Sequence, residues 1–430
     1  MTSAIELSSA ILRGDADIRN HHPFSASGAL EELAPGVAFV TAFANVSAFT
    51  GVDAAGASEL LLVDTGSQFH ADVIHREVRR WTKAPLRTAV YTHGHVDHVF
   101  GTGQFEAENA ANEWGPVNVV AHAHVARRFD RYVATAGWNG AINARQFQVP
   151  GMRFPTTYRY PDETYTDQRD VVVAGAQIQL RHAKGETDDH TWTWMPSTKT
   201  LCCGDLFIWC SPNAGNPQKV QRFALEWAAA LEAMADMGAE LLFPGHGLPI
   251  AGAATIRTVL CDTAELLRSL HDQSLALMND GARLDDLIHG VVVPAHLVNK
   301  PYLQPIYDEP EFVVRNVWRR YGGWYDGNPA TLKPAPAAAL AEELAELAGG
   351  AAVLAIRAQS LAASGKDADL RLAGHLAETA RMAAPNDPAV VAAHAEVFEA
   401  KRDAATSTMA KGIFAWAAGE SRAALASPGE

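Results

Sequence analysis

The stretch Tyr91-Thr-His-Gly-His-Val-Asp-His98 directly follows a run of apolar and β-branched residues that predicts a strand. It therefore places four potential metal ligands close together on a loop at the carboxyl end of that strand. In an extended loop, side chains two residues apart point the same way, so His93 and His95 can converge on one cation while Asp97 and His98 turn toward a second. Imidazole nitrogen and carboxylate oxygen are both good ligands of Zn²⁺.

Four ligands are too few for two cations, and further donors occur in suitable places later in the chain. They are Glu186, Asp205 and His246, and each follows a predicted strand and has glycine beside it. Glycine lets the backbone bend, so that a neighbouring donor can approach a metal closely. Taken alone, each of these residues is readily explained as a cap, a turn or a core residue. Their combination with the histidine-rich loop favours a metal site.

The surrounding sequence predicts alternating strands and helices. The expected strands are 60–64, 87–92, 117–121, 171–181, 191–195 and 239–243, and the expected helices are 70–82, 124–136 and 221–237. Together with paired strands near 171–205, this order predicts sheets covered by outer helices.

The order of the donors resembles that of the metallo-β-lactamase superfamily, which is His-x-His-x-Asp-His, a third ligand, a bridging Asp and a final His. The chain is more similar to the alkyl sulfatase branch, because Glu186 stands where most of the superfamily has His, and because its distance to Asp205 suits that branch. A second segment, VRNVWRRYGGWYDGNP over 314–329, is similar to the start of the alkyl sulfatase dimerisation domain.

The resemblance implies an α+β protein in which an αββα sandwich is followed by an all-α dimerisation domain. We expect the catalytic domain over 1–252, a connecting helix and an irregular, aromatic-rich segment over 253–334, and a helical domain over 335–430. Ala-rich helical segments are expected at 336–348, 350–364, 367–383 and 387–402. They resemble stacked hairpins of the tetratricopeptide type, although a plain bundle fits the pattern equally well. A homodimer follows from this domain and from the apolar helices.

The resemblance also implies a ligand set for two Zn(II) ions per chain, with Mn or Fe not excluded. The first zinc would be held by His93, His95 and Glu186, the second by Asp97, His98 and His246, with Asp205 bridging. Asp97 and Asp205 are thus the expected catalytic carboxylates. The metals would lower the pKa of a shared water to give hydroxide near neutral pH.

The expected substrate contacts are Asn213, Trp209 and Gln218. In alkyl sulfatases an Asn and an Arg after the bridging carboxylate hold the sulfate. Asn213 falls at the Asn position, and Gln218 stands at the Arg position, with Lys219 and Arg222 nearby. Trp209 follows Asp205 on an exit loop, which makes it a candidate for the wall of the site. Many family members continue with a sterol-carrier-like domain, and none is expected here.

Several other polar residues near the motifs have open roles. Asp64 ends a predicted strand and is expected to hydrogen-bond the ligand loop or cap its turn. Asp189 and His190 can act as a general acid or can orient ligating histidines, and the sequence leaves both roles open. His122 and His124 are expected to be ordinary surface or core residues.

Composition narrows the function classes. The formal charge of −14 disfavours nucleic acid and anionic membrane surfaces as partners. The first thirty residues lack the pattern of a signal peptide, and no apolar run approaches the ~18 residues of a transmembrane helix, so we expect a cytoplasmic protein with no membrane insertion. The four cysteines are too few for a disulfide framework.

The sequence therefore predicts a binuclear zinc hydrolase that cleaves a sulfate ester or a related small ester. An alternative keeps the metals and changes the bond to a lactone, a carboxylic ester or a phosphoester. A second alternative is a non-catalytic dimeric scaffold. A flavin-linked di-iron oxygen reductase is disfavoured, because that branch usually has Glu where His95 stands.

Overall fold

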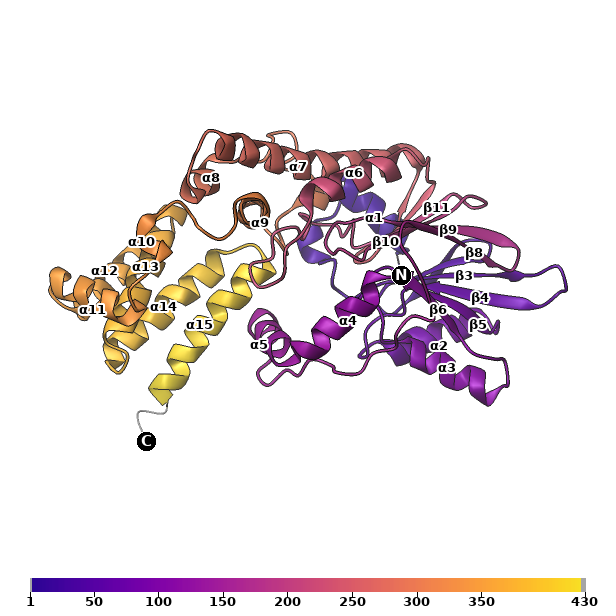
Figure 1. Ribbon diagram of the computed structural model, residues 1–430, viewed down its shortest axis with the longest axis horizontal. Coiled ribbons are helices and arrows are strands. Elements are labelled where there is room, and N and C mark those ends of the chain that lie inside the picture. Colours follow the sequence, from indigo (N-terminus) through magenta and orange to yellow (C-terminus); the bar gives the residue numbers. More distant parts are fainter. Residues whose placement is uncertain (1, 427–430) are drawn as a thin grey trace. The chain divides into compact units, whose positions relative to one another are not determined.

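The structure is a computed structural model that describes residues 2–426 (Figure 1). It divides into two compact units. The first is made of residues up to Ala136, Pro155–Ala282 and Asp286–Gly322, and the second of Gly137–Phe154, Arg283–Asp285 and the residues from Gly323 onward. Within the described range, no helix has both the length and the apolar character needed to cross a bilayer.

The first unit is built on two sheets. The seven-stranded sheet runs in the order β1 (Leu30–Ala34), β2 (Val37–Val40), β3 (Val46–Val52), β4 (Ser58–Val63), β5 (Leu86–Tyr91), β6 (Asn118–His122) and β7 (Glu163–Tyr165). The six-stranded sheet runs in the order β13 (Ile250–Ala251), β12 (Leu241–Pro244), β11 (Thr200–Gly204), β10 (Thr191–Met195), β9 (Ala176–His182) and β8 (Gln168–Val173). Strands β4 to β7 pair in parallel, so the carboxyl ends of β4, β5 and β6 lie at one edge.

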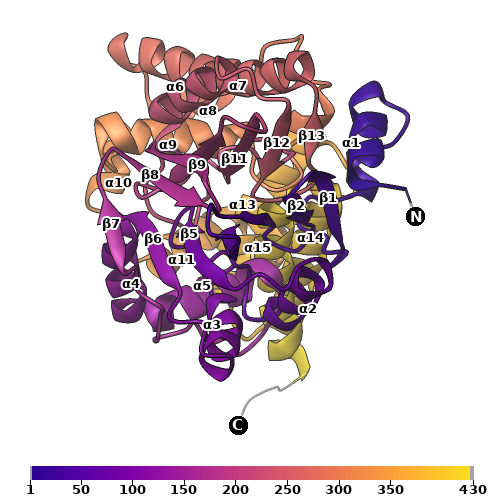
Figure 2. The ribbon, with the colours of Figure 1, turned by 90° about the vertical axis from the view of Figure 1, so that its right-hand side faces the viewer.

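The two sheets pack face to face because each presents an apolar face. Phe39, Phe49 and Val63 of the first sheet meet Leu180 and Phe243 of the second in one buried core. Outer helices cover the sandwich: α2 (Ala71–Trp81) and α3 (Thr102–Ala111) lie on one side, and α6 (Ala224–Ala235) and α7 (Ala253–Asn279) lie on the other (Figure 2). The predicted two-sheet fold with outer helices is confirmed.

The remaining elements of this unit are short or connect the layers. They are α1 (Ala4–Arg13), η1 (Ile18–Asn20), α4 (His124–Ala134), η2 (Pro301–Leu303) and α9 (Pro310–Gly322). The expectation of an irregular aromatic-rich segment is wrong where α9 forms. Pro310 begins this helix, and its Val313, Val314 and Val317 are buried on one face.

The expectation of one strand over 171–181 is also wrong. The chain reverses between β8 and β9, because Ala174 and Gly175 adopt positive φ angles of 48° and 82°. Two such residues make a tight hairpin turn, and an Ala at the first position hides this turn from sequence patterns.

The second unit is helical, and its helices are α11 (Ala337–Ala348), α12 (Ala351–Ala362), α13 (Asp367–Ala383), α14 (Pro388–Ala404) and α15 (Thr408–Ala426). The first four match the expected ranges closely, and α15 was not expected. Helix α11 packs on α12 and α13, and α12 packs on α13 and α14, as in stacked hairpins. Alanine lines these interfaces, for example Ala355, Ala380 and Ala393. Shorter or connecting helices are α5 (Ala136–Phe147), α8 (Leu284–Gly290) and α10 (Pro329–Leu332).

Candidate metal centre

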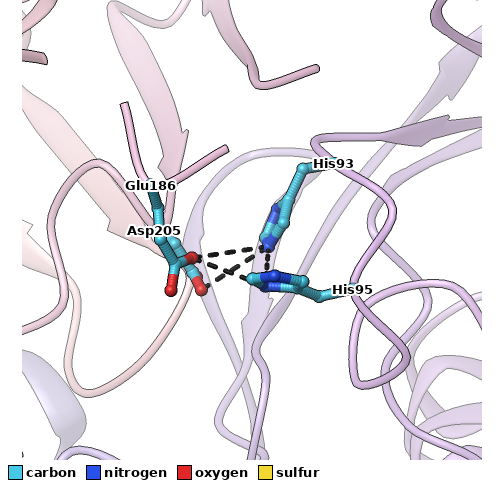
Figure 3. Close-up of side chains that lie close together, drawn as sticks. All are labelled: His93, His95, Glu186 and Asp205. Carbon is cyan, nitrogen blue, oxygen red and sulfur yellow. Dashed lines mark hydrogen bonds and ion pairs between the residues drawn. The ribbon is translucent and has the colours of Figure 1, made fainter. Parts of the chain in front are cut away.

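All seven donors expected from the sequence gather at one edge of the first unit. His93, His95, Glu186 and Asp205 form one group, Asp97, His98 and His246 form a second, and the ligand atoms of each group lie within 4.8 Å of one another. Figure 3 shows the first group, in which the imidazoles of His93 and His95 face the carboxylates of Glu186 and Asp205. The donors come from the loops after β5, β9, β11 and β12, where neighbouring strands end together.

The Asp205 carboxylate lies between the two groups. Its Oδ2 atom is 3.6 Å from Nε2 of His93 in the first group and 3.3 Å from Nε2 of His246 in the second. Its Oδ1 atom is 3.4 Å from Nε2 of His98. One carboxylate therefore reaches both groups, which is the position that a bridging ligand needs.

Several buried atoms that face the centre make no hydrogen bond. Among the described residues these include Nε2 of His98, Oε2 of Glu186 and Oδ1 of Asp205. A buried polar atom without a partner is costly, and a cation within each group would satisfy these atoms. The imidazole and carboxylate donors suit zinc and are compatible with manganese or iron. The residues present thus fit two candidate metal sites.

Burial and mutual charge set the protonation of the donors. Burial lowers the pKa of His93 and His95 well below the ordinary value, which favours the neutral imidazoles that ligate metals. Burial raises the pKa of Glu186 to about 8, although the Arg222 charge opposes this shift. Burial opposes ionisation of Asp205 as well, but the neighbouring histidines, with His246 first, hold its pKa well below the usual range.

Asp64 holds the ligand loop, as expected. Its Oδ2 atom lies 2.7 Å from Nδ1 of His98, and its two oxygens accept hydrogen bonds of 2.7 Å from the backbone N–H and the hydroxyl of Thr92. Because the carboxylate accepts the Nδ1 proton, the Nε2 lone pair of His98 is left to point at the centre. Asp64 is buried at the end of β4 with a φ of 59°, a conformation that Asp tolerates better than most residues.

The loop that carries His246 is fastened from the other sheet. Nδ1 of His246 bonds to the carbonyl oxygen of Phe43. The amide of Asn45 donates to the carbonyls of Pro244 and Gly247 at 3.0 and 2.9 Å. Sequence reasoning did not find Asn45 or Phe43, because no local pattern links them to a loop some two hundred residues away.

Trp209 supports this loop from behind. Its side chain is fully buried, and its indole N–H donates to the carbonyl oxygen of Leu248 at 2.6 Å. A side chain with no exposed surface and a satisfied donor is part of the scaffold. The structure therefore places Trp209 in the packing and not on an open wall of the site.

Glu186 is held by two buried partners. The Arg222 guanidinium forms an ion pair with Oε1 of Glu186, and the Asn213 amide donates a hydrogen bond to the same oxygen. Oε2 is left directed at His93 and His95, at 3.7 and 3.5 Å. The amide nitrogen expected to hold a substrate anion is thus engaged by a proposed metal ligand. Asn213 therefore orients Glu186 in this structure.

The turn after Asn213 carries the remaining expected contact. Gln218 is half-buried, and its backbone N–H donates to Oδ1 of Asn216 at 3.1 Å. Lys219 is also half-buried, and burial lowers its pKa to about 7. Asp308 fixes this turn by accepting hydrogen bonds of 2.7 and 3.1 Å from the backbone N–H groups of Gly215 and Asn216.

Asp189 and His190 lie behind the ligands and orient them. Nε2 of His190 accepts a hydrogen bond of 3.0 Å from the backbone N–H of Asp205, and burial lowers the pKa of His190 to about 4. Asp189 accepts from the backbone N–H of Gly94 at 3.0 Å and from Arg128 at 2.8 Å. Of the two roles that the sequence left open, these contacts favour orientation of the ligand loops.

His122 is a core residue. It is buried, and its ring stacks on His182 with centroids 3.7 Å apart. His122 ends β6 and His182 ends β9, so the stacked pair joins the two sheets at the edge that carries the donors. His124 is half-buried, with Nδ1 3.4 Å from Oδ2 of Asp188.

Comparisons with known proteins agree with this geometry. Residues 52–246 match the family model of the metallo-beta-lactamase superfamily. The chain belongs to this superfamily, and the two-sheet fold described above agrees with that membership. Residues 283–424 match the family described as alkyl sulfatase dimerisation. Within the superfamily, the chain therefore belongs to the alkyl sulfatase branch and carries its dimerisation domain.

Individual relatives are similar at moderate identity. The chain is 27% identical over 317 residues to a linear primary-alkylsulfatase of a Pseudomonas strain, covering 68% of this chain and 59% of that one. It is 28% identical over 328 residues to an (R)-specific secondary-alkylsulfatase of Pseudomonas, covering 69% and 49%. The solved structure of a stereoselective inverting sec-alkylsulfatase from Pseudomonas has the same fold, with a TM-score of 0.80 and 24% identity over 92% of this chain and 65% of that one. The chain thus spans about half to three fifths of the length of these curated relatives.

Proposed function

We propose that the protein is a binuclear metal-dependent hydrolase that cleaves sulfate esters, with zinc as the favoured metal. The observation that carries the proposal is the Asp205 carboxylate, which lies within 3.6 Å of ligand nitrogens in both donor groups. The likeness to alkylsulfatases supports a sulfate ester as the substrate.

The chain's own residues would perform two tasks, holding the cations and keeping their ligands oriented. His93, His95 and Glu186 would hold one cation, and Asp97, His98 and His246 would hold the other, with Asp205 shared. Two divalent cations, when bound, would lower the pKa of a water to supply the nucleophile and would polarise the ester oxygen. Asp64 and His190 would keep His98 and Asp205 oriented, so that the site needs no rearrangement when the substrate arrives.

Positive charge near the first donor group supports an anionic substrate. Arg222 is buried against Glu186. Lys219 follows Gln218 in the turn after Asn213 and lies close enough to interact with the charges of Glu186 and Asp97. We expect Lys219 to supply the cation that Gln218 does not, because an ammonium group attracts sulfate oxygens without needing the planar fork of Arg.

A second candidate reaction keeps the same residues and changes the bond. Gln218 is neutral where the alkyl sulfatases have Arg, which favours a less anionic substrate such as a lactone or a carboxylic ester. A panel of sulfate esters, lactones, carboxylic esters and phosphoesters, assayed before and after metal removal, separates the candidates. Metal-dependent turnover of sulfate esters supports the proposal. Turnover of lactones alone would replace it, and metal-independent behaviour throughout would favour a scaffold.

We further propose that the helical region pairs two copies of the chain. Apolar side chains are exposed along α11 and α12, where Leu347 is 77% and Ile356 is 66% accessible, with Leu340, Leu344 and Val353 beside them in the sequence of these helices. Such a stripe on neighbouring helices is typical of a protein interface. The match of this region to a dimerisation family favours a second copy as the partner. Light scattering at micromolar concentration would test it, since a monomer would overturn the proposal.

A further inference from the structure

Aromatic side chains surround the imidazole of His246. The ring centroid of Phe24 lies 4.2 Å from that of His246, 4.4 Å from that of Tyr307 and 5.4 Å from that of Phe43. Phe43 also meets His246 edge-on at 5.7 Å. These rings offer carbon surface and no metal ligand, so the donor chemistry described above leaves them without a role.

Phe24 is supplied by residues 21–28, which we call the N-terminal strap. A turn forms the middle of the strap, with a hydrogen bond of 2.8 Å from the N–H of Ser25 to the carbonyl oxygen of His22. Its end is tied down by a bond of 2.8 Å from the N–H of Gly28 to the carbonyl oxygen of Thr41. The strap precedes the region that matches the superfamily model, so the superfamily's motifs do not account for it.

One of the two partly exposed donors, Asp97, lies beside His246 and therefore on the side of the centre that carries these rings. The side chains of Asp97 and His95 are 22% and 19% accessible, whereas those of the other five donors are nearly inaccessible. Asp97 faces His246, with Oδ2 3.6 Å from Nε2. Phe24 and Phe43 are each half-buried, so part of each ring is open to solvent, while Tyr307 is buried against Phe24.

The surroundings of the two donor groups therefore differ in character. Arg222 lies against Glu186 of the first group, whereas aromatic carbon lies against His246 of the second. An ester of a strong acid with an organic alcohol has the same division, with a charged end and an apolar end. In this arrangement the charged end of such a substrate would face the first donor group, and the apolar end would face the second.

We propose that Phe24 and Phe43 form the surface on which the organic group of the ester packs, and that the N-terminal strap is a specificity element of the centre. The inference rests on the proposed function, because it assigns the apolar end of that substrate. Burying a methylene group against carbon contributes about fourfold in affinity, so the length of the organic group is the variable that reports on this surface.

The test compares Phe24→Ala and Phe24→Leu with the unaltered, zinc-loaded protein. The probes are linear alkyl sulfonates from ethyl to dodecyl, which lack the cleavable ester bond, and their affinities are measured by calorimetry. Turnover of the matching alkyl sulfates gives kcat and KM separately. Phe69→Ala is the matched control, because Phe69 is 80% accessible and makes none of the ring contacts described above.

We expect affinity to rise with chain length in the unaltered protein and in Phe69→Ala. In Phe24→Ala the octyl probe should bind about tenfold or more weakly, with ethyl sulfonate binding and zinc content unchanged, which corresponds to the loss of about two buried methylene groups. Phe24→Leu should be intermediate, because it keeps part of the apolar surface. The loss should be found in KM and not in kcat.

Two results would overturn the inference. An equal loss at every chain length, together with weaker zinc binding, would mean that Phe24 only supports His246. Unchanged binding at every length would mean that the organic group packs elsewhere. If the unaltered protein binds the sulfonates with a dependence on length and on Phe24 but cleaves no sulfate, the proposed function fails and this surface stands. If the protein cleaves sulfate esters but the Phe24 variants change neither binding nor turnover, the proposed function stands and the inference about this surface fails.

Discussion

Replacing Asp64 by Asn tests whether the residues behind the ligands set metal affinity. The carboxylate accepts three hydrogen bonds, from Nδ1 of His98 and from the N–H and hydroxyl of Thr92. Asn has one carbonyl oxygen, so its NH₂ group must face either the Thr92 N–H or His98. In the first orientation two donors oppose each other. In the second, Nδ1 of His98 becomes the acceptor, and the proton moves to the Nε2 atom that faces the centre.

Either orientation weakens the group formed by Asp97, His98 and His246. Loss of a partner that orients a ligating histidine costs about 10- to 100-fold in metal affinity. This corresponds to about 1.4–2.8 kcal/mol. We expect a chelator-competition titration with Zn²⁺ to resolve two sites in Asp64→Asn. One site should keep the affinity of the unaltered protein, and the other should show this loss. Asp53→Asn is the control, because Asp53 is a half-buried turn carboxylate far in sequence from the donors, which accepts local hydrogen bonds from the backbone N–H groups of Ala55 and Ala57. Unchanged affinity at both sites, or an equal loss in the control, would refute the reasoning.

Three further predictions concern other parts of the molecule. Arg222→Met removes the charged partner of the buried Glu186 carboxyl, which then takes up a proton because burial raises its pKa to about 8 even beside Arg222. The free energy of unfolding should fall by about 1–3 kcal/mol in denaturant titrations, with Arg222→Lys recovering part of it; equal stability of the Met and Lys variants would contradict this. Burial raises the pKa of Asp308 to about 7 from the ordinary 3.8. The protonated carboxyl therefore stabilises the fold fully below pH 3.8, and this stabilisation is lost as pH rises through about 7. Asp308→Asn should flatten the dependence of Tm on pH between these two values, and an unaltered slope would count against a raised pKa of Asp308. The double variant Leu347→Glu, Ile356→Glu should be a monomer in light scattering where the unaltered protein is a dimer, and a persistent dimer would place the interface elsewhere.

The sequence predicted which residues gather at the candidate metal centre, because each lies in a short local pattern. His93 to His98 form one loop after a strand, and the later donors follow strands beside glycine. Strands that end at one edge of a sandwich bring such loops together without further information. The helices of the second unit were predicted for a similar reason, since Gly349, Gly350 and Pro388 mark their ends locally.

The parts that could not be predicted depend on contacts between distant residues. Phe24 and His246 are more than two hundred positions apart, and nothing in the sequence near Phe24 distinguishes it from a core aromatic. Asn213 and Trp209 were placed by their proximity to Asp205, but the direction in which a loop residue points is decided by the packing around it. The structure turns Trp209 toward Leu248 and Asn213 toward Glu186.

The short strands at one end of the seven-stranded sheet escaped prediction for a different reason. Strand β1 holds no β-branched residue, and β2 has only four residues. Strand β1 pairs with β2, and β2 pairs in turn with β3, which lies later in the chain. Their importance for the centre is indirect but large. The turn between β2 and β3 carries Phe43 and Asn45, which fasten the His246 loop.

The central claim is that Asp205 is shared by two metal ions. Zinc-edge anomalous scattering from crystals grown with zinc tests it most directly. We expect two peaks, one within bonding distance (about 2.0–2.2 Å) of His93, His95 and Glu186 and the other equally close to Asp97, His98 and His246, with an Asp205 oxygen bonded to each. A single peak, or two peaks of which only one contacts Asp205, would contradict it.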